Sequence, residues 1–156
     1  MLGYLASGEQ VVDRHRSHLH PEAQRMLPYA LQKIKSTGLD FFIEEVEFPF
    51  IIGQKTCVAT DSSDVVVYAR RLRRFGLSRF VMNREAEDCR HMVVILKKVS
   101  SDMFILITAF VGRKAEKEPW DRNAELDKSL EFWNRHALIW GSEKTVPRTD
   151  TFECPW

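Results

Sequence analysis

Apolar residues near the start of the chain follow a helical spacing. Between Pro21 and Lys35 they recur every three or four positions, which places them on one face of a helix. Pro21 suits a first helical turn, whereas Pro28 removes a backbone donor inside the segment and predicts a kink or a split into two shorter helices. Gly38 ends the pattern. A weaker helix is expected upstream, over residues 9–19.

After this point the pattern changes to segments rich in β-branched and aromatic residues, which are typical of strands. Segments 91–98 and 103–111 are separated by residues 99–102, whose Ser and Asp favour a turn, so they predict an antiparallel hairpin. Segment 103–111 is apolar on both faces, and we expect it to be central in its sheet. The other expected strands are 40–48, 55–60, 64–70 and 78–84.

The C-terminal part predicts one more helix and a tail. Asp121 or Asn123 is expected to cap a helix that runs to about Ala137, with Trp120 packed beside it. From residue 141 to 156 the chain is polar and punctuated by proline, which is typical of a tail. We therefore predict a single α+β domain over 1–156, with N-terminal helices, an antiparallel sheet of about five to six strands and one C-terminal helix.

Charge is segregated along the chain. Residues 68–84 contain six arginines and no acid, although the whole chain has a formal net charge of only +1. The rest of the chain has 17 basic and 22 acidic residues. Arginines interleaved with Tyr68, Phe75 and Phe80 can neutralise phosphates and stack on bases. The alternative is a solvated basic turn. The near-neutral total predicts one local site, not a wholly basic surface.

Several protein classes are excluded by what the sequence lacks. No segment has the 18 or so apolar residues of a membrane span, and the N-terminus has no secretory pattern. Three widely spaced cysteines form neither a disulfide framework nor a zinc motif, which favours a cytoplasmic protein. No nucleotide, hydrolase or metalloprotease signature is present, so we expect neither a cofactor nor a metal.

Histidines offer a weak site. His15, His18 and His20 lie close together, but no carboxylate completes a ligand set around them. A single histidine, one of these or His91, is a better candidate for a general base, because imidazole titrates near neutral pH.

Strand alternation sorts the arginines. In segment 78–84, Arg79 and Arg84 are expected on opposite faces, so only one of them would line a site unless a bulge intervenes. In segment 64–70, Tyr68 and Arg70 are expected to share a face that Arg71 opposes.

Thr108 is the only polar side chain within segment 103–111. Alternation places it on the face of Phe104, Leu106 and Phe110. It is interpreted either as a threonine bonded to backbone or as a hydroxyl at the floor of a shallow site.

The stretch 65–85 and its continuation resemble a group of small, uncharacterised bacterial proteins. The shared pattern is a Tyr-Ala-Arg-Arg stretch, an Arg-Phe-Val strand ending in Asn-Arg-Glu, a Thr-Ala-Phe strand and a closing Glu-Pro-Trp-Asp. The resemblance covers about residues 56–121 and implies a family without a function.

A more distant resemblance is to the barnase, colicin and RelE-like ribonucleases, which place arginines on a small antiparallel sheet. The resemblance implies a metal-independent ribonuclease of toxin type, with RNA as partner and a cognate inhibitor protein. It implies that Arg70, Arg79 and Arg84 clamp the phosphate. Thr108 would supply a hydroxyl contact, and Asp121 or His91 would carry the proton. Nucleic-acid contacts would come from Tyr68, Arg71, Arg73, Arg74 and Asn83.

Two other functions stay open from the sequence. A nucleic-acid or phosphate-binding module would use the same arginines without an acid or a base. An interaction protein of a mobile element would use the acidic remainder and the aromatic tail as contact surfaces.

Overall fold

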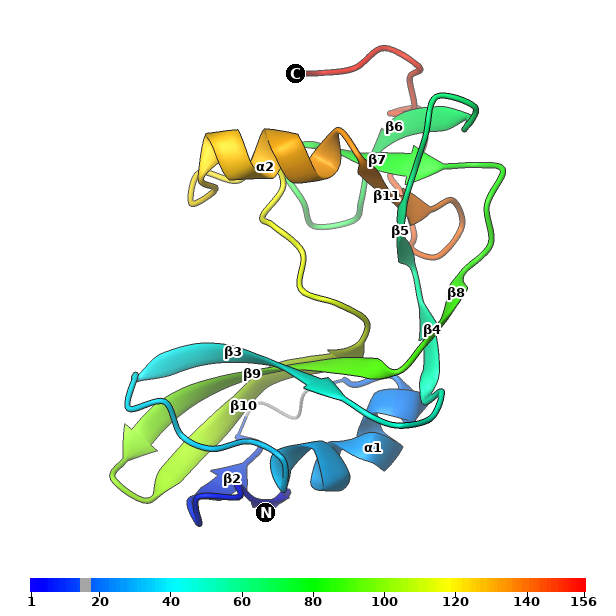
Figure 1. Cartoon of the computed structure of the whole chain (residues 1–156). Helices are drawn as coiled ribbons and strands as arrows, with labels where there is room; N and C mark the ends of the chain where they lie inside the picture. Colours follow the sequence, from blue (N-terminus) through cyan, green and yellow to red (C-terminus); the bar gives the residue numbers. More distant parts are fainter. Residues whose placement is uncertain (15–17) are drawn as a thin grey trace. The chain divides into compact units, whose positions relative to one another are not determined.

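The computed structural model describes residues 1–14 and 18–156, and it is mostly sheet, with 37% strand and 12% helix (Figure 1). The chain forms two compact units. Unit 1 comprises residues 1–54 and 88–114, and unit 2 comprises residues 55–87 and 115–156. The chain passes from one unit to the other within β4 (Gly53–Lys55), within β8 (Glu87–Cys89) and between residues 114 and 115. The strands β4 and β8 pair as a two-stranded sheet.

Unit 1 is a five-stranded sheet with one helix against it. The strand order is β1-β2-β10-β9-β3, and α1 (Pro21–Leu31) packs on one face. The helix buries Ala23, Met26, Leu27, Ala30 and Leu31 against the core of the sheet. The strand bounds are Gly3–Tyr4, Gln10–Val12, Phe41–Glu47, His91–Ser100 and Met103–Val111 for β1, β2, β3, β9 and β10.

The predicted hairpin of β9 and β10 is confirmed. The two strands pair antiparallel from Met103 opposite Ser100 to Val111 opposite Met92, and β10 is the third of the five strands. Its residues Phe104, Leu106 and Ala109 complete the core of unit 1, whereas Ile107 and Phe110 of the same apolar run are exposed.

A β-bulge in β10 changes the direction of Thr108. The register shifts between Leu106 and Thr108, so that Thr108 lies opposite Ile95 while Leu106 lies opposite Leu96. Leu106 is in the core against α1, whereas Thr108 faces the other side of the sheet together with Phe110. The expectation that Thr108 shares a face with Leu106 is therefore wrong, because a bulge adds one residue and reverses the alternation.

Unit 2 is a four-stranded sheet in the order β5-β11-β7-β6, with the helix α2 (Leu126–Trp133). β11 pairs antiparallel with β5 and parallel with β7, and β6 pairs antiparallel with β7. Residues after β11 return to β6, where the backbones of Tyr68 and Thr151 exchange two hydrogen bonds of 2.8 Å. The bounds of β5, β6, β7 and β11 are Cys57–Ala59, Val66–Arg70, Leu77–Val81 and His136–Ile139.

The predicted fold class is wrong in three respects. Among the described N-terminal residues a single helix, α1, stands where N-terminal helices were expected, and it continues through Pro28 without splitting. Residues 10–12 of the expected upstream helix form β2, which pairs parallel with β10. The strands of residues 1–14 and 18–156 form three sheets, two of them with a parallel pair, in place of one antiparallel sheet. The expectation of a single domain stays a prediction.

The C-terminal helix is shorter than predicted. It begins after Glu125, which is the N-cap residue, and ends at Trp133, so neither Asp121 nor Asn123 caps it. Ala137 lies in β11 instead, because a turn at Asn134 and Arg135 stops the helix and the next residues pair with two distant strands.

Candidate functional site

The arginine-rich stretch forms the β6–β7 hairpin of unit 2. The strands pair from Val66 opposite Val81 to Arg70 opposite Leu77, and residues 71–76 connect them. We call residues 70–76 the basic loop. Four of the six arginines lie in it, while Arg79 lies within β7 and Arg84 lies beyond its end.

Arg71 anchors the basic loop to the rest of unit 2. Its Nε donates to Ser78 Oγ at 3.0 Å, its Nη1 to the Glu143 carboxylate at 2.9 Å, and its Nη2 to the Glu118 carboxylate. The Arg71 side chain is 17% exposed and that of Glu118 only 8%. A guanidinium held by two carboxylates has little charge left for a ligand, so Arg71 acts in the structure as an anchor.

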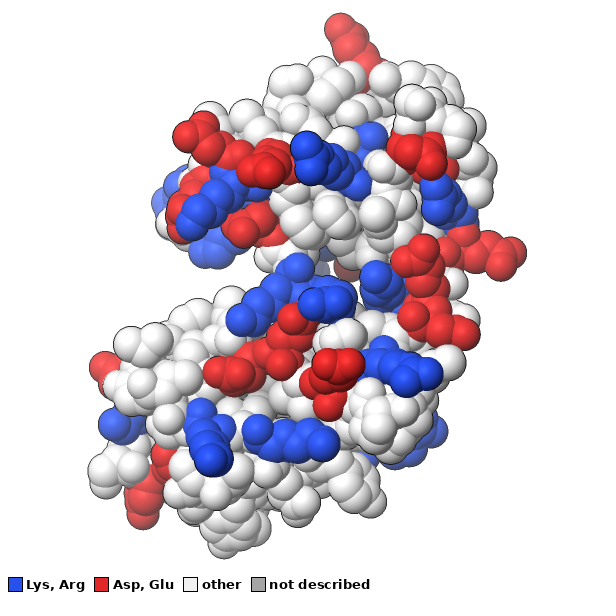
Figure 2. All heavy atoms as spheres, in the orientation of Figure 1, with Lys and Arg blue, Asp and Glu red and all other residues white. Residues whose placement is uncertain are grey.

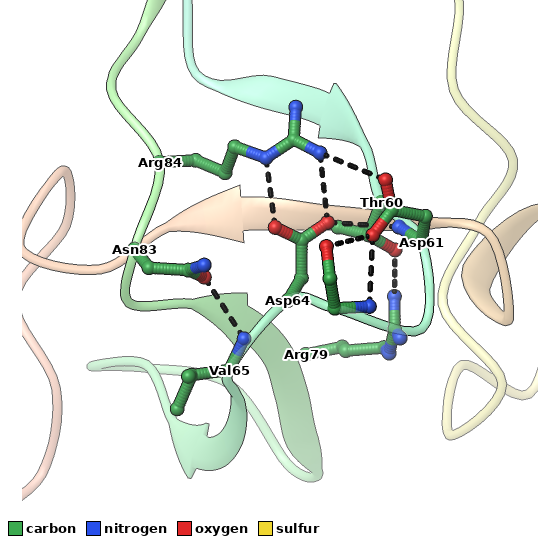
Figure 3. A network of polar contacts seen from close by, with 8 residues as sticks. Thr60, Asp61, Asp64, Val65, Arg79, Asn83 and Arg84 are labelled. Atoms are coloured by element: carbon green, nitrogen blue, oxygen red, sulfur yellow. Dashed lines mark hydrogen bonds and ion pairs between the residues drawn. The ribbon is translucent and has the colours of Figure 1, made fainter.

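Arg79 and Arg84 both reach the loop of residues 60–64 (Figure 3). Arg79 Nη1 donates to Thr60 Oγ1 at 2.8 Å and to a backbone carbonyl of β11 at 3.0 Å. Arg84 holds Asp64 through two hydrogen bonds, of 2.7 and 3.0 Å, and lies 3.4 Å from Asp61. These contacts join the β5–β6 connection to β7 and neutralise Arg84.

Alternation fails for these two arginines because β7 ends at Val81. Beyond that residue the chain turns, and Asn83 accepts a 2.8 Å hydrogen bond from the Val65 amide through its Oδ1. The turn brings Arg84 to the same loop that Arg79 contacts (Figure 3). Strand alternation, from which opposite faces were expected unless a bulge intervened, does not apply to Arg84, because it lies beyond the end of β7.

The contact with Arg84 lowers the pKa of Asp64. The hydrogen bond from Arg84 is the main cause of the lowered Asp64 pKa, and the hydrogen bond from the Asp61 amide is the next. The pKa of Asp61 is also lowered, mainly by the hydrogen bond from the Ser63 hydroxyl. A lowered pKa in the folded state stabilises the fold above the ordinary Asp value of 3.8. That contribution is lost as the pH falls through the lowered value.

We expect Arg84→Ala to raise the pKa of Asp64 toward 3.8 and to move acid unfolding to higher pH. Carboxyl NMR titration measures the first effect, and urea unfolding at pH values between neutral and 3 measures the second. Arg135→Ala removes an exposed arginine of the same unit and serves as the control. An unchanged Asp64 pKa in Arg84→Ala would contradict the assignment.

Three arginines of the basic loop remain free. Arg70, Arg73 and Arg74 are exposed, and their guanidinium groups have no acidic partner among the described residues. Beside them lies a shallow depression of about 250 Å³, lined by Arg71, Leu72, Arg74, Glu143 and Lys144. Lys144 is exposed and likewise unpaired in the described part of the chain. Cations that no carboxylate neutralises are available to an anion.

The backbone of the basic loop is fixed at several points. The Arg74 amide bonds to the Arg71 carbonyl at 3.2 Å, and the Leu72 amide to the Lys144 carbonyl at 3.3 Å. Arg73 sits at the left-handed φ of 62°. A residue with a Cβ costs about 1–2 kcal/mol in this conformation relative to glycine, so the turn carries a charged side chain at an energetic cost.

The aromatic residues of this region divide into buried and exposed ones. Tyr68 stacks edge-on against Trp156 at 5.3 Å, and Phe80 against Trp140 at 5.3 Å, and both rings are buried. Phe75 is 93% exposed. Of the three aromatic residues interleaved with the arginines, only Phe75 can meet a ligand without unfolding the sheet.

Other predicted site residues lie elsewhere. Thr108 and His91 belong to unit 1, where His91 begins β9 with its Nε2 3.9 Å from a Glu47 carboxylate oxygen, and Thr108 is opposite Ile95 further along the strand. Asp121 lies in unit 2, where its Oδ1 accepts the Asn123 amide at 2.8 Å in a turn before α2. Their catalytic roles stay predictions.

The histidine group predicted near the N-terminus is described only in part. His15 lies outside the described residues, and His20 Nδ1 is 3.8 Å from Glu22. Among residues 1–14 and 18–156, no three side chains of His, Cys, Asp or Glu converge to hold a metal. In the same described ranges, the helices are too short or too polar to cross a membrane.

Sequence reasoning missed two residues near the site. Lys144 lies 60 positions beyond the arginine stretch in a polar tail, and no local signal marks it. His136 begins β11, and its ring stacks on that of Phe132 with the ring centroids 4.0 Å apart. The Nδ1 of His136 lies 2.9 Å from the backbone carbonyl oxygen of Phe132. Because a carbonyl only accepts, Nδ1 carries the proton, which leaves Nε2 as the basic nitrogen.

Comparison with known proteins adds no family or function: no family model, curated protein or solved structure matches this chain.

Proposed function

We propose that this protein binds the phosphate backbone of nucleic acid through the basic loop and Lys144. The observation that carries the proposal is the division of the arginines: Arg71 and Arg84 are held by carboxylates, whereas Arg70, Arg73 and Arg74 have none among the described residues. Free guanidinium groups on a fixed loop suit phosphate oxygens, to which arginine donates in a fork.

The distribution of charge supports a small contact. On the face that Figure 2 shows, acidic and basic side chains are interspersed over both units, so this face is not a broad cationic surface. The formal net charge is +1. A protein of this kind contacts few phosphates, and we infer a binding site of a few nucleotides centred on the loop.

We expect the double substitution Arg73→Ala, Arg74→Ala to weaken RNA binding and to reduce its salt dependence. For a single strand, the slope of log affinity against log salt changes by about 0.7 per lost phosphate contact, so two contacts change it by about 1.4. Fluorescence anisotropy of a labelled oligouridine at several salt concentrations gives the slope.

A matched control separates a site from overall charge. Arg122→Ala with Arg135→Ala removes the same charge from two exposed positions of unit 2 outside the basic loop. We expect the slope of this control to remain that of the parent. Equal slopes in both double variants would mean that the loop makes no phosphate contact.

Cleavage of the bound RNA is a second candidate, and the orientation of His136 favours it. The Phe132 carbonyl holds Nδ1 of His136, and Nε2 is the basic nitrogen. Arg79 Nη1 donates to the backbone carbonyl of His136. Metal-independent attack by a 2′-hydroxyl needs a base and a cation, and we infer that His136 and Arg79 would supply them. Incubation of RNA with the protein in EDTA tests this: products that His136→Gln abolishes favour a ribonuclease, and intact RNA leaves a binding module.

A further inference from the structure

Phe75 is exposed to an unusual degree for a large apolar side chain. Its ring is 93% exposed at the tip of the basic loop, and the residues before it are Arg73 and Arg74. Within the described structure, no core cluster includes it and no aromatic partner stacks on it. The fold therefore gains almost nothing from this ring.

The exposure of Phe75 does not come from a loose loop. On one side the chain is fixed by the Arg71 contacts and by the turn that the Arg74 amide closes. On the other side Gly76 packs so closely on Trp120 that a Cβ there would lie 2.2 Å from the indole Cγ. The ring is thus presented from a fixed backbone, which lowers the entropy that a partner would have to remove.

The chemistry of the tip fits an unpaired base. An aromatic face stacks on a nucleobase, and neighbouring arginines hold the phosphates on either side of it. In a duplex the faces of the bases are covered by their neighbours and only base edges are open. We infer that Phe75 stacks on an unpaired base, so that the basic loop selects single-stranded nucleic acid; this inference rests on the proposed function.

A membrane surface is the other partner that cations and an apolar tip could suit. Membrane binding grows with the apolar area that enters the interface. Here the exposed apolar side chains of the loop are Phe75 and Leu72 alone, and Leu72 lines the polar depression with Glu143. One ring is enough to stack on a base, whereas it is a small area for an interface. The loop thus favours a nucleic acid.

The experiment compares single strands with duplexes. Affinities of the parent, Phe75→Ala and Phe75→Trp are measured by anisotropy for a labelled oligouridine and for an RNA duplex of equal length. We expect Phe75→Ala to weaken single-strand binding by about 5- to 150-fold and Phe75→Trp to retain it. Duplex affinity and the salt slope should not change, because stacking releases no counterions. Phe152→Ala, at a position 73% exposed in the same unit, is the matched control and should bind as the parent does.

Each result has one meaning. If Phe75→Ala binds the single strand as tightly as the parent while Arg73→Ala with Arg74→Ala weakens it, the stacking inference is overturned and phosphate binding stands. If the parent binds no oligonucleotide, the proposed function fails as well. Vesicles of phosphatidylcholine with phosphatidylserine are the third probe. If the parent binds these vesicles but no RNA, and Phe75→Ala abolishes vesicle binding, the loop contacts a membrane, and both the stacking inference and the proposed function are overturned.

Discussion

Replacing Arg71 with alanine is expected to lower the free energy of unfolding by about 3–5 kcal/mol, because it leaves a buried carboxylate without its partner. Glu118 is 8% exposed, and its second oxygen, Oε1, already has no hydrogen-bond partner in the described structure. Removing the guanidinium would also release Glu143 and the Ser78 hydroxyl. Urea unfolding followed by tryptophan fluorescence measures the loss.

The size of this effect separates an anchor from a ligand contact. Total stabilities of domains are about 5–15 kcal/mol, so a loss of this size removes a large fraction of the total. Arg74→Ala, in the same loop and exposed, should change stability by no more than about 0.5 kcal/mol. If Arg71→Ala left the unfolding curve unchanged and weakened RNA binding alone, Arg71 would belong to the ligand site, as the sequence predicted.

A second substitution tests the buried charge itself. Glu118→Gln in the Arg71→Ala background removes the unpaired charge and keeps the shape of the side chain, so it should restore part of the lost stability. Stability that stays as low in the double variant as in Arg71→Ala would show that the contact contributes through packing instead of charge.

The hairpin of unit 1 could be predicted because its signal is local. A run such as residues 103–111, apolar on both faces, has one stable place in a sheet, and the turn residues before it fix the direction of its neighbour. The bulge at Thr108 could not be predicted, since a single extra residue leaves no mark in an apolar run and still reverses every later side chain.

Short strands that depend on distant partners were missed for the opposite reason. Gln10–Val12 and His136–Ile139 have three and four residues, and each becomes a strand by pairing with segments far away in the chain. In the segment His136–Ile139, Ala137 also continues the helical spacing of α2, so the pattern favoured a longer helix. Local spacing does not contain the long-range pairing that decides such cases.

The arginines show the same limit at the site. Composition marked residues 68–84 as cationic, but which cations are free depends on carboxylates that lie elsewhere in the chain. Glu118 and Glu143 are 47 and 72 positions from Arg71. Only the fold brings these carboxylates to Arg71, and it leaves the arginines at the tip of the basic loop without an acidic partner among the described residues.

Replacing Gly76 with alanine is expected to destabilise the protein by close to the upper end of about 1–3 kcal/mol, the usual cost of overpacking. The new Cβ would lie 2.2 Å from Cγ, 2.3 Å from Cβ and 2.6 Å from Cδ1 of Trp120. Rotation of the Trp120 side chain can move Cγ and Cδ1 but leaves Cβ in place, so the backbone of the basic loop has to shift.

The shift should appear in binding as well as in stability, because Gly76 follows Phe75 directly and fixes the end of the loop. Unfolding in urea, the tryptophan fluorescence of the folded state and anisotropy with oligouridine measure the three consequences. Gly141→Ala is the control: no atom lies within 4 Å of its Cβ, and its φ of 89° limits the cost to backbone strain, about 1–2 kcal/mol, with no effect on RNA affinity. If Gly76→Ala were as stable as the parent and bound RNA equally well, the close packing on Trp120 would not hold the loop, and the rigidity that presents Phe75 would need another source.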